Sequence, residues 1–229
     1  MGYFSPDRLF VYFARLIVLF TSMPVHEFAH GWVADKLGDH TARYQGRLDL
    51  NPLAHLDPLG TILILFTGFG WAKPVPVNPS KFNRKITMRA GMALTSLAGP
   101  AANVLMATIL LLVYKIIALV LMLMNVPMGN AVQIVTTILS MMVTINVSLA
   151  VFNLLPVPPL DGYHILAYFL PARWEYLIAQ YSRYIFLGLF AVMMFTNILS
   201  LPLTLLSNVI YRFLDFITGF VDVLANMLL

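Results

Sequence analysis

The stretch that decides the fold is Leu9–Ala34, LFVYFARLIVLFTSMPVHEFAHGWVA. It is mostly apolar and has the length of a membrane-spanning helix. Near its end stand His26 and His30, four residues apart, with Glu27 beside the first. Positions i and i+4 share one face of a helix, so both imidazoles can bind one metal ion while Glu27 faces a water molecule. This H-E-x-x-H pattern is typical of zinc proteases, and here it predicts one that cuts inside or beside the bilayer.

The alternative interpretation is a helix end whose polar residues meet the lipid headgroups. It would explain one histidine or one glutamate but explains the triplet poorly, because an ionisable group costs about 2.5–3.5 kcal/mol when it is charged at the centre of a span. The composition also favours a membrane protein: 60% of the residues are hydrophobic and 10% are charged, whereas about a quarter are charged in soluble proteins. The chain has no cysteine, which excludes disulfides and a cysteine-based zinc site.

The apolar runs predict an all-α polytopic membrane protein with about five to six transmembrane helices. We expect a single domain over residues 1–229, with the H-E-x-x-H span at 9–35 and a loop region at 36–90. Further spans are expected at 91–124, 130–153, 174–199 and 202–228. The proline-rich stretch LPVPPLDG interrupts the apolar pattern after the third of these five spans and should precede a short helix at 161–170.

The loop region contains two segments of special interest. Residues 59–69 are apolar but too short to span, which favours a re-entrant or interfacial piece. The alternation of valine and proline in WAKPVPV suits an extended strand. Val75 and Val77 could then pair with an unwound substrate through their N–H groups; the alternative is an ordinary surface loop. His55 could line the cavity or touch substrate, although the surface location of most loops favours a solvent-exposed histidine.

Charge placement predicts the orientation in the membrane. The net charge is +4, and residues 70–90 carry five basic residues and no acidic one. This loop should be cytoplasmic by the positive-inside rule, and such a local cluster does not indicate nucleic acid binding. The connection near Asn125 is uncharged and should lie outside. The catalytic site is therefore expected on the cytoplasmic side of the cell membrane.

A catalytic zinc usually takes three protein ligands and a water molecule, so a third ligand must come from elsewhere in the chain. Asp161 is the best-placed acidic residue, because it follows the proline-rich break and precedes Gly162. A helix N-cap is an equally good local explanation of Asp161. His164 could support Asp161 from the same helix face, and a plain interfacial histidine is the favoured interpretation there.

Together these residues carry a family pattern. H-E-F-A-H in a first span, followed by NLLPVPPLDG at 153–162, resembles the site-2 protease family of intramembrane zinc metalloproteases. NPLAHLDPLG, GFGWAKPVPVNP and SLAGPAAN also resemble its compact bacterial subgroup without a PDZ domain.

The resemblance implies one Zn²⁺ per chain, with His26, His30 and Asp161 as ligands and Glu27 as general base. It also implies that Asn153 helps to bind the substrate or transition state, although the residue could equally cap its span. The implied partners are lipids and transmembrane or signal-peptide-like helices, cleaved in regulated intramembrane proteolysis. Two alternatives stay open: a metal transporter, and a catalytically silent relative that binds membrane helices.

Overall fold

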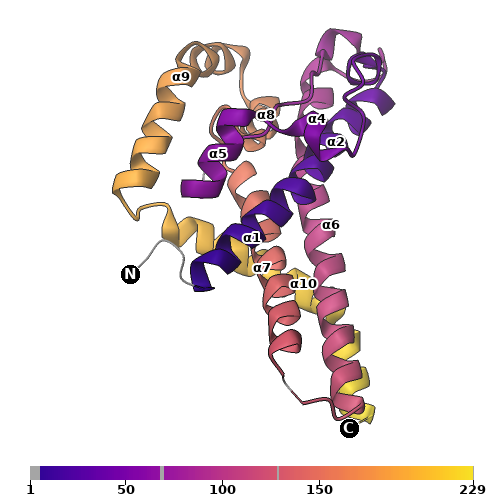
Figure 1. The fold of residues 1–229 in the computed structure, drawn as a ribbon. Helices are drawn as coiled ribbons and strands as arrows, with labels where there is room; N and C mark the ends of the chain where they lie inside the picture. Colours follow the sequence, from indigo (N-terminus) through magenta and orange to yellow (C-terminus); the bar gives the residue numbers. More distant parts are fainter. Residues whose placement is uncertain (1–5, 68–69, 128, 229) are drawn as a thin grey trace.

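The computed structural model describes residues 6–67, 70–127 and 129–228, and within them it contains helices and connecting segments but no strand (Figure 1). In chain order the elements are α1 (Pro6–Phe20), α2 (Ser22–Lys36), α3 (Thr41–Tyr44), α4 (Pro52–His55), α5 (Pro58–Thr67), the 3₁₀ helix η1 (Pro79–Lys81), α6 (Met88–Leu123), α7 (Asn130–Asn153), α8 (Asp161–Phe169), α9 (Ala172–Phe195) and α10 (Ser200–Leu228).

Among the described residues, three helices are long and apolar enough to cross a membrane: α6, α7 and α9. The predicted all-α membrane protein is therefore confirmed. Helix α7 has the predicted bounds, α6 and α10 differ from theirs by one to three residues, and α9 begins two residues earlier and ends four residues earlier than expected. Helices α1 and α2 have 15 residues each and α10 carries three charged side chains, so the count of five to six spans stays a prediction.

The predicted H-E-x-x-H span over 9–35 consists of two helices, because the chain breaks between α1 and α2 at Thr21. Pro24 has no N–H to donate to the carbonyl of Phe20, and the loss of such a bond kinks or interrupts a helix. Thr21 leaves the helical conformation, with φ −122° and ψ −62°. The break separates the apolar first half from the half that carries the histidines.

The apolar core lies where α6, α7 and α10 meet, and in Figure 1 these three helices run together towards the C-terminal end. A cluster of small and branched side chains fills this contact: Ala107, Val143, Val147, Val151 and Leu214. The histidines of α2 lie towards the opposite end of α6, because α2 packs on the first turns of that helix. The core therefore leaves one end of α6 available to support a polar site.

The loop region is more ordered than the sequence predicted, since α3, α4, α5 and η1 fall within it. Residues 70–78 are extended but form no ladder, so the strand-like prediction is wrong in that respect. Pro74 and Pro76 cannot donate backbone hydrogen bonds, which prevents regular pairing. The segment is fixed to the end of α2 instead: Asn78 donates its N–H to Asp39 Oδ2 at 2.5 Å. The re-entrant character of 59–69 stays a prediction.

Helix α8 is fixed at its C-terminal end by Arg89 of α6. The guanidinium Nη2 donates to the carbonyls of Ala167 and Leu170, and it lies 3.1 Å from Glu175 Oε2 at the start of α9. The last carbonyls of a helix lack intrahelical partners, so a cation there both satisfies and orients them. Because α8 begins with Asp161, this contact helps to set the position of that carboxylate.

Candidate metal centre

His26 and His30 lie one turn apart on α2, and their side chains converge. The two Nε2 atoms are 3.0 Å apart, and the rings meet edge to face at an interplanar angle of 84°. Both side chains are largely buried, with exposed fractions of 10% and 12%. The local i,i+4 geometry of a helix therefore presents two imidazole nitrogens to one point, as the sequence predicted.

Asp161 reaches the same point from α8. One carboxylate oxygen lies 3.3 Å from His26 Nε2 and the other lies 3.4 Å from His30 Nε2. Asp161 is the first residue of α8 rather than its N-cap, which is Leu160, and no side-chain cap hydrogen bond forms there. The structure therefore favours the ligand interpretation of Asp161 over the capping interpretation.

Burial by itself would raise the pKa of the Asp161 carboxyl, but its contacts with His26 and His30 lower that pKa to about 2. The group is therefore ionised at neutral pH, as a carboxylate ligand must be.

The dimensions of this cluster fit a tetrahedral zinc site. With bonds of about 2.0–2.1 Å, neighbouring ligand atoms in such a site are about 3.3–3.4 Å apart. The two Nε2 atoms are 3.0 Å apart, and they lie 3.3 and 3.4 Å from different oxygens of Asp161, so each of these contacts has about the length of a tetrahedron edge. Asp161 Oδ2 is buried without a hydrogen-bond partner. Among the described residues, this is the one group of three or more metal-binding side chains that converge in this way.

The orientation of His30 is fixed by α6. Its Nδ1 lies 2.7 Å from the carbonyl oxygen of Thr95. Because a carbonyl only accepts, Nδ1 must carry the proton and donate it, which leaves the lone pair of Nε2 free for a metal. No local pattern of residues predicts this contact, because Thr95 and His30 are 65 positions apart.

Gly99 allows α6 to approach the two histidines closely. A Cβ atom added at this position would overlap the rings of both His30 and His26. Glycine is therefore required at 99 for the imidazoles to occupy their present positions. The small residues of SLAGPAAN predicted close helix contact in general, and the structure identifies that contact as one between α6 and the ligand-bearing face of α2.

Glu27 lies beside the cluster and is held by the extended segment. The backbone N–H of Val75 donates to Glu27 Oε2 at 2.9 Å, and Val75 itself is 8% exposed. The expectation that the Val75 N–H is free for a substrate strand is therefore wrong. This bond orients a carboxylate that lies beside the ligand set without belonging to it, as a general base requires.

A cavity of about 750 Å³ opens beside the cluster. Its wall contains the three predicted ligands, Glu27, Asn153 and Val77, together with apolar side chains from α9: Phe186, Leu189, Phe190, Met193 and Met194. Asn153 is the last residue of α7 and donates its Nδ2 to the carbonyl of Leu149 at 3.0 Å. The cavity is large enough for a stretch of peptide, and the roles of Asn153 and Val77 in binding it stay predictions.

Two other histidines differ from expectation. His55 is fully buried and does not line the cavity, so both the solvent-exposed interpretation and the substrate-binding one are wrong. The Nε2 of His55 lies 2.7 Å from the carbonyl of Asp49, and the His55 carbonyl accepts the N–H of Lys73. His55 therefore links two parts of the loop region. His164 borders the cavity, and burial lowers its pKa. It is therefore closer to the centre than a plain interfacial histidine would be.

Comparison with known proteins agrees with this geometry. The family model described as "Peptidase family M50" matches residues 14–197. The chain belongs to peptidase family M50. Membership of this family of metalloproteases implies a bound zinc ion, and the His26, His30 and Asp161 cluster supplies suitable ligands for it.

Two similar proteins bear names that agree with the family. A protein of Bacillus subtilis (strain 168) named "Putative zinc metalloprotease YwhC" is 42% identical over 178 residues, which cover 76% of this chain and 78% of that protein. A protein of Mycolicibacterium smegmatis named "Putative zinc metalloprotease Rip2" is 28% identical over 200 residues, or 85% of this chain and 70% of that one. No solved structure gave a significant match.

Gly99→Ala should lower the zinc content of the purified protein, because the added methyl group displaces both imidazoles. Gly219→Ala is the matched control, since nothing lies within 4 Å of a Cβ at that position of α10. Alanine is favoured over glycine in a helix by about 1 kcal/mol, so neither change should weaken its own helix. Metal analysis after dialysis would measure the difference. Equal zinc in the two variants would contradict the close approach at Gly99.

Proposed function

We propose that this chain is an intramembrane zinc endopeptidase that hydrolyses peptide bonds in transmembrane or signal-peptide-like helices. The single observation that carries the proposal is the convergence of His26, His30 and Asp161 beside Glu27, in a mostly apolar cavity to which the membrane-type helices α6, α7 and α9 contribute. Such a site exposes a hydrolytic centre to membrane segments rather than to soluble peptides. The expected biological role is regulated intramembrane proteolysis.

Each residue has a distinct chemical task in this proposal. His26, His30 and Asp161 hold Zn²⁺, which when bound polarises the scissile carbonyl and lowers the pKa of water. The Glu27 carboxylate, oriented by the N–H of Val75, takes a proton from the attacking water. It then delivers that proton to the departing amine. Asn153 has a second N–H on its Nδ2 beyond the one given to Leu149, and it can donate this hydrogen to the substrate carbonyl as negative charge develops.

The substrate must lose its helical hydrogen bonds before its peptide groups can reach Glu27. The extended segment can hold the unwound chain, and Val77 is the residue suited to this role. It is half-buried, borders the cavity and has no hydrogen bond to its N–H among the described residues. Val75 cannot bind the substrate in this way, because its N–H already donates to Glu27.

Val77→Pro should slow cleavage about three- to tenfold by removing that N–H, the usual effect of one lost hydrogen bond. Val77→Ala keeps the N–H and serves as the control. Zinc content should be unchanged in both variants. Cleavage at the wild-type rate by the proline variant would show that Val77 does not bind substrate in this way.

Glu27→Gln should keep zinc and lose cleavage by about 10²–10⁴-fold, because the amide cannot act as a general base. His26→Ala and Asp161→Ala should instead lose zinc together with cleavage. The assay is cleavage of a tagged single-span protein by purified enzyme in detergent, with metal analysis of each variant. A Glu27→Gln variant that cuts at near wild-type rate would refute the role of Glu27. Full zinc in Asp161→Ala would remove Asp161 from the ligand set.

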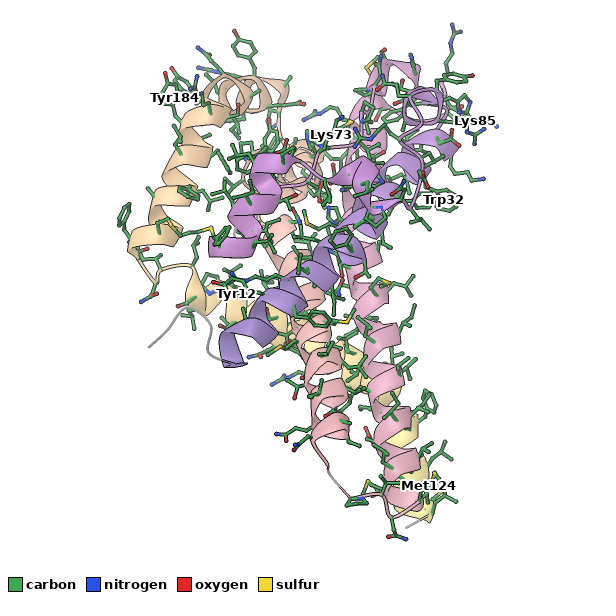
Figure 2. The ribbon with its side chains drawn as sticks, viewed as in Figure 1. Tyr12, Trp32, Lys73, Lys85, Met124 and Tyr184 are labelled. Carbon is green, nitrogen blue, oxygen red and sulfur yellow. The ribbon has the colours of Figure 1, made fainter. Side chains whose placement is uncertain are left out.

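We further propose that the catalytic end of the molecule faces the cytoplasm. Lys73 and Lys85 lie at one end of the molecule in Figure 2, and Met124 lies at the other. The basic residues of the 70–90 loop therefore share one end with the loops next to α2, as the positive-inside rule requires for a cytoplasmic face.

A thiol probe can test this orientation, because the chain has no cysteine of its own. Ser80→Cys places an exposed thiol in the basic loop, and Val126→Cys places one at the opposite end. An impermeant reagent added to intact cells should label Cys at 126 and not at 80. The reverse pattern would overturn the proposed orientation.

A further inference from the structure

Helix α6 presents a row of three residues to the metal centre. The carbonyl of Thr95 accepts the hydrogen bond from His30, and Gly99 contacts both imidazole rings. Asn103 follows four residues later, about 6 Å further along the helix axis at 1.5 Å per residue. The side chain of Asn103 therefore lies next to the centre, deeper along α6, and it borders the same cavity as Glu27 and Asn153.

Asn103 is buried in an unusual state. Its exposed fraction is 0%, yet neither its Oδ1 nor its Nδ2 has a hydrogen-bond partner. A carboxamide can accept through its oxygen and donate two hydrogens through its nitrogen. Buried polar groups are nearly always paired, because an unpaired one loses its hydration without compensation. The amide of Asn103 therefore has a donor and an acceptor that make no hydrogen bond within the described part of the protein.

Two other asparagines show that this state is specific to Asn103. Asn153 donates its Nδ2 to the carbonyl of Leu149, and Asn146 donates its Nδ2 to the carbonyl of Met142. Both thus bond to the preceding turn of their own helix. Asn103 makes no such bond on α6, so both of its amide atoms are unpaired, whereas in Asn146 only Oδ1 is unpaired. Asn103 also borders the cavity, and Asn146 does not.

We infer that Asn103 binds a main-chain peptide group of the unwound substrate, an inference that rests on the proposed proteolysis of membrane helices. Unwinding exposes peptide N–H and C=O groups that find few hydrogen-bonding partners along a mostly apolar cavity wall. A carboxamide is complementary to such a group: Oδ1 accepts the peptide N–H and Nδ2 donates to the peptide C=O. Because every residue of a substrate carries this group, Asn103 favours an unwound backbone over any particular side chain.

Asn103→Leu tests the inference, since leucine has the same branched arrangement of side-chain heavy atoms and no polar atoms. Removing an unpaired buried amide should leave the thermal stability of the full-length protein unchanged or raised. Zinc content should also stay unchanged. The KM for a single-span substrate in detergent should rise about tenfold with little change in kcat, as expected when an interaction that is equally strong in the ground and transition states is lost. A purely structural asparagine would show the opposite pattern, with lower stability and unchanged KM.

Asn146→Leu is the matched control, because it also replaces a fully buried asparagine but lies outside the cavity wall. Its KM should equal that of the wild type. Asn103→Ala should repeat the rise in KM and keeps the inference testable if the leucine variant does not fold. An unchanged KM in either folded Asn103 variant would overturn the inference.

A substrate series identifies the peptide group involved. In each member, one amide N–H near the cleavage site is replaced by an ester oxygen, which removes one donor. The wild-type enzyme should lose about tenfold in kcat/KM at one position, and Asn103→Leu should show no further loss there. Equal losses of kcat/KM for both enzymes at every position would contradict a contact between Asn103 and a substrate N–H. If the wild type cleaves no membrane helix at all, the proposed function fails; if it cleaves and Asn103→Leu does so equally well, only the role of Asn103 fails.

Discussion

The contact on which the rest of the structure depends is the meeting of two imidazoles and one carboxylate at a single point. His26 and His30 approach from α2, and Asp161 approaches from the start of α8, with donor atoms 3.0–3.4 Å apart. Three polar groups this close are unfavourable inside an apolar protein unless they pair with one another or share a cation. The break at Thr21, the proline-rich turn before α8 and the glycine at 99 all serve to bring these groups together.

Helix α6 is the support on which both halves of the centre are built. Its early turns contact the rings of α2 at Gly99 and orient His30 through the Thr95 carbonyl. Its Arg89 holds the far end of α8. The extended segment then adds the general base, because the N–H of Val75 orients Glu27. Rigid support of this kind fixes the position of each reacting group before substrate arrives, which is the main contribution a protein makes to catalysis at a metal.

The sequence predicts what depends on local periodicity. The i,i+4 histidines, the bounds of α7 and the position of Asp161 after a proline break all follow from a few neighbouring residues. Contacts between distant segments could not be predicted from such patterns. The Val75 N–H meets Glu27 across 48 positions, and no periodic pattern reports such a bond. His55 looked like a loop histidine, yet it is fully buried because the 49–55 turn folds around it. Asn103 ends the segment SLAGPAAN, which predicted close helix contact and carried the family resemblance but indicated no binding role for this asparagine.

X-ray absorption spectroscopy at the zinc edge identifies the ligands of the bound metal without mutation. We expect one zinc per chain with two imidazole nitrogens and one carboxylate oxygen from the protein, at about 2.0–2.2 Å. One further light atom should come from water. A spectrum that requires three or four imidazoles, or a sulfur ligand from methionine, would contradict the assignment of His26, His30 and Asp161 as the metal centre.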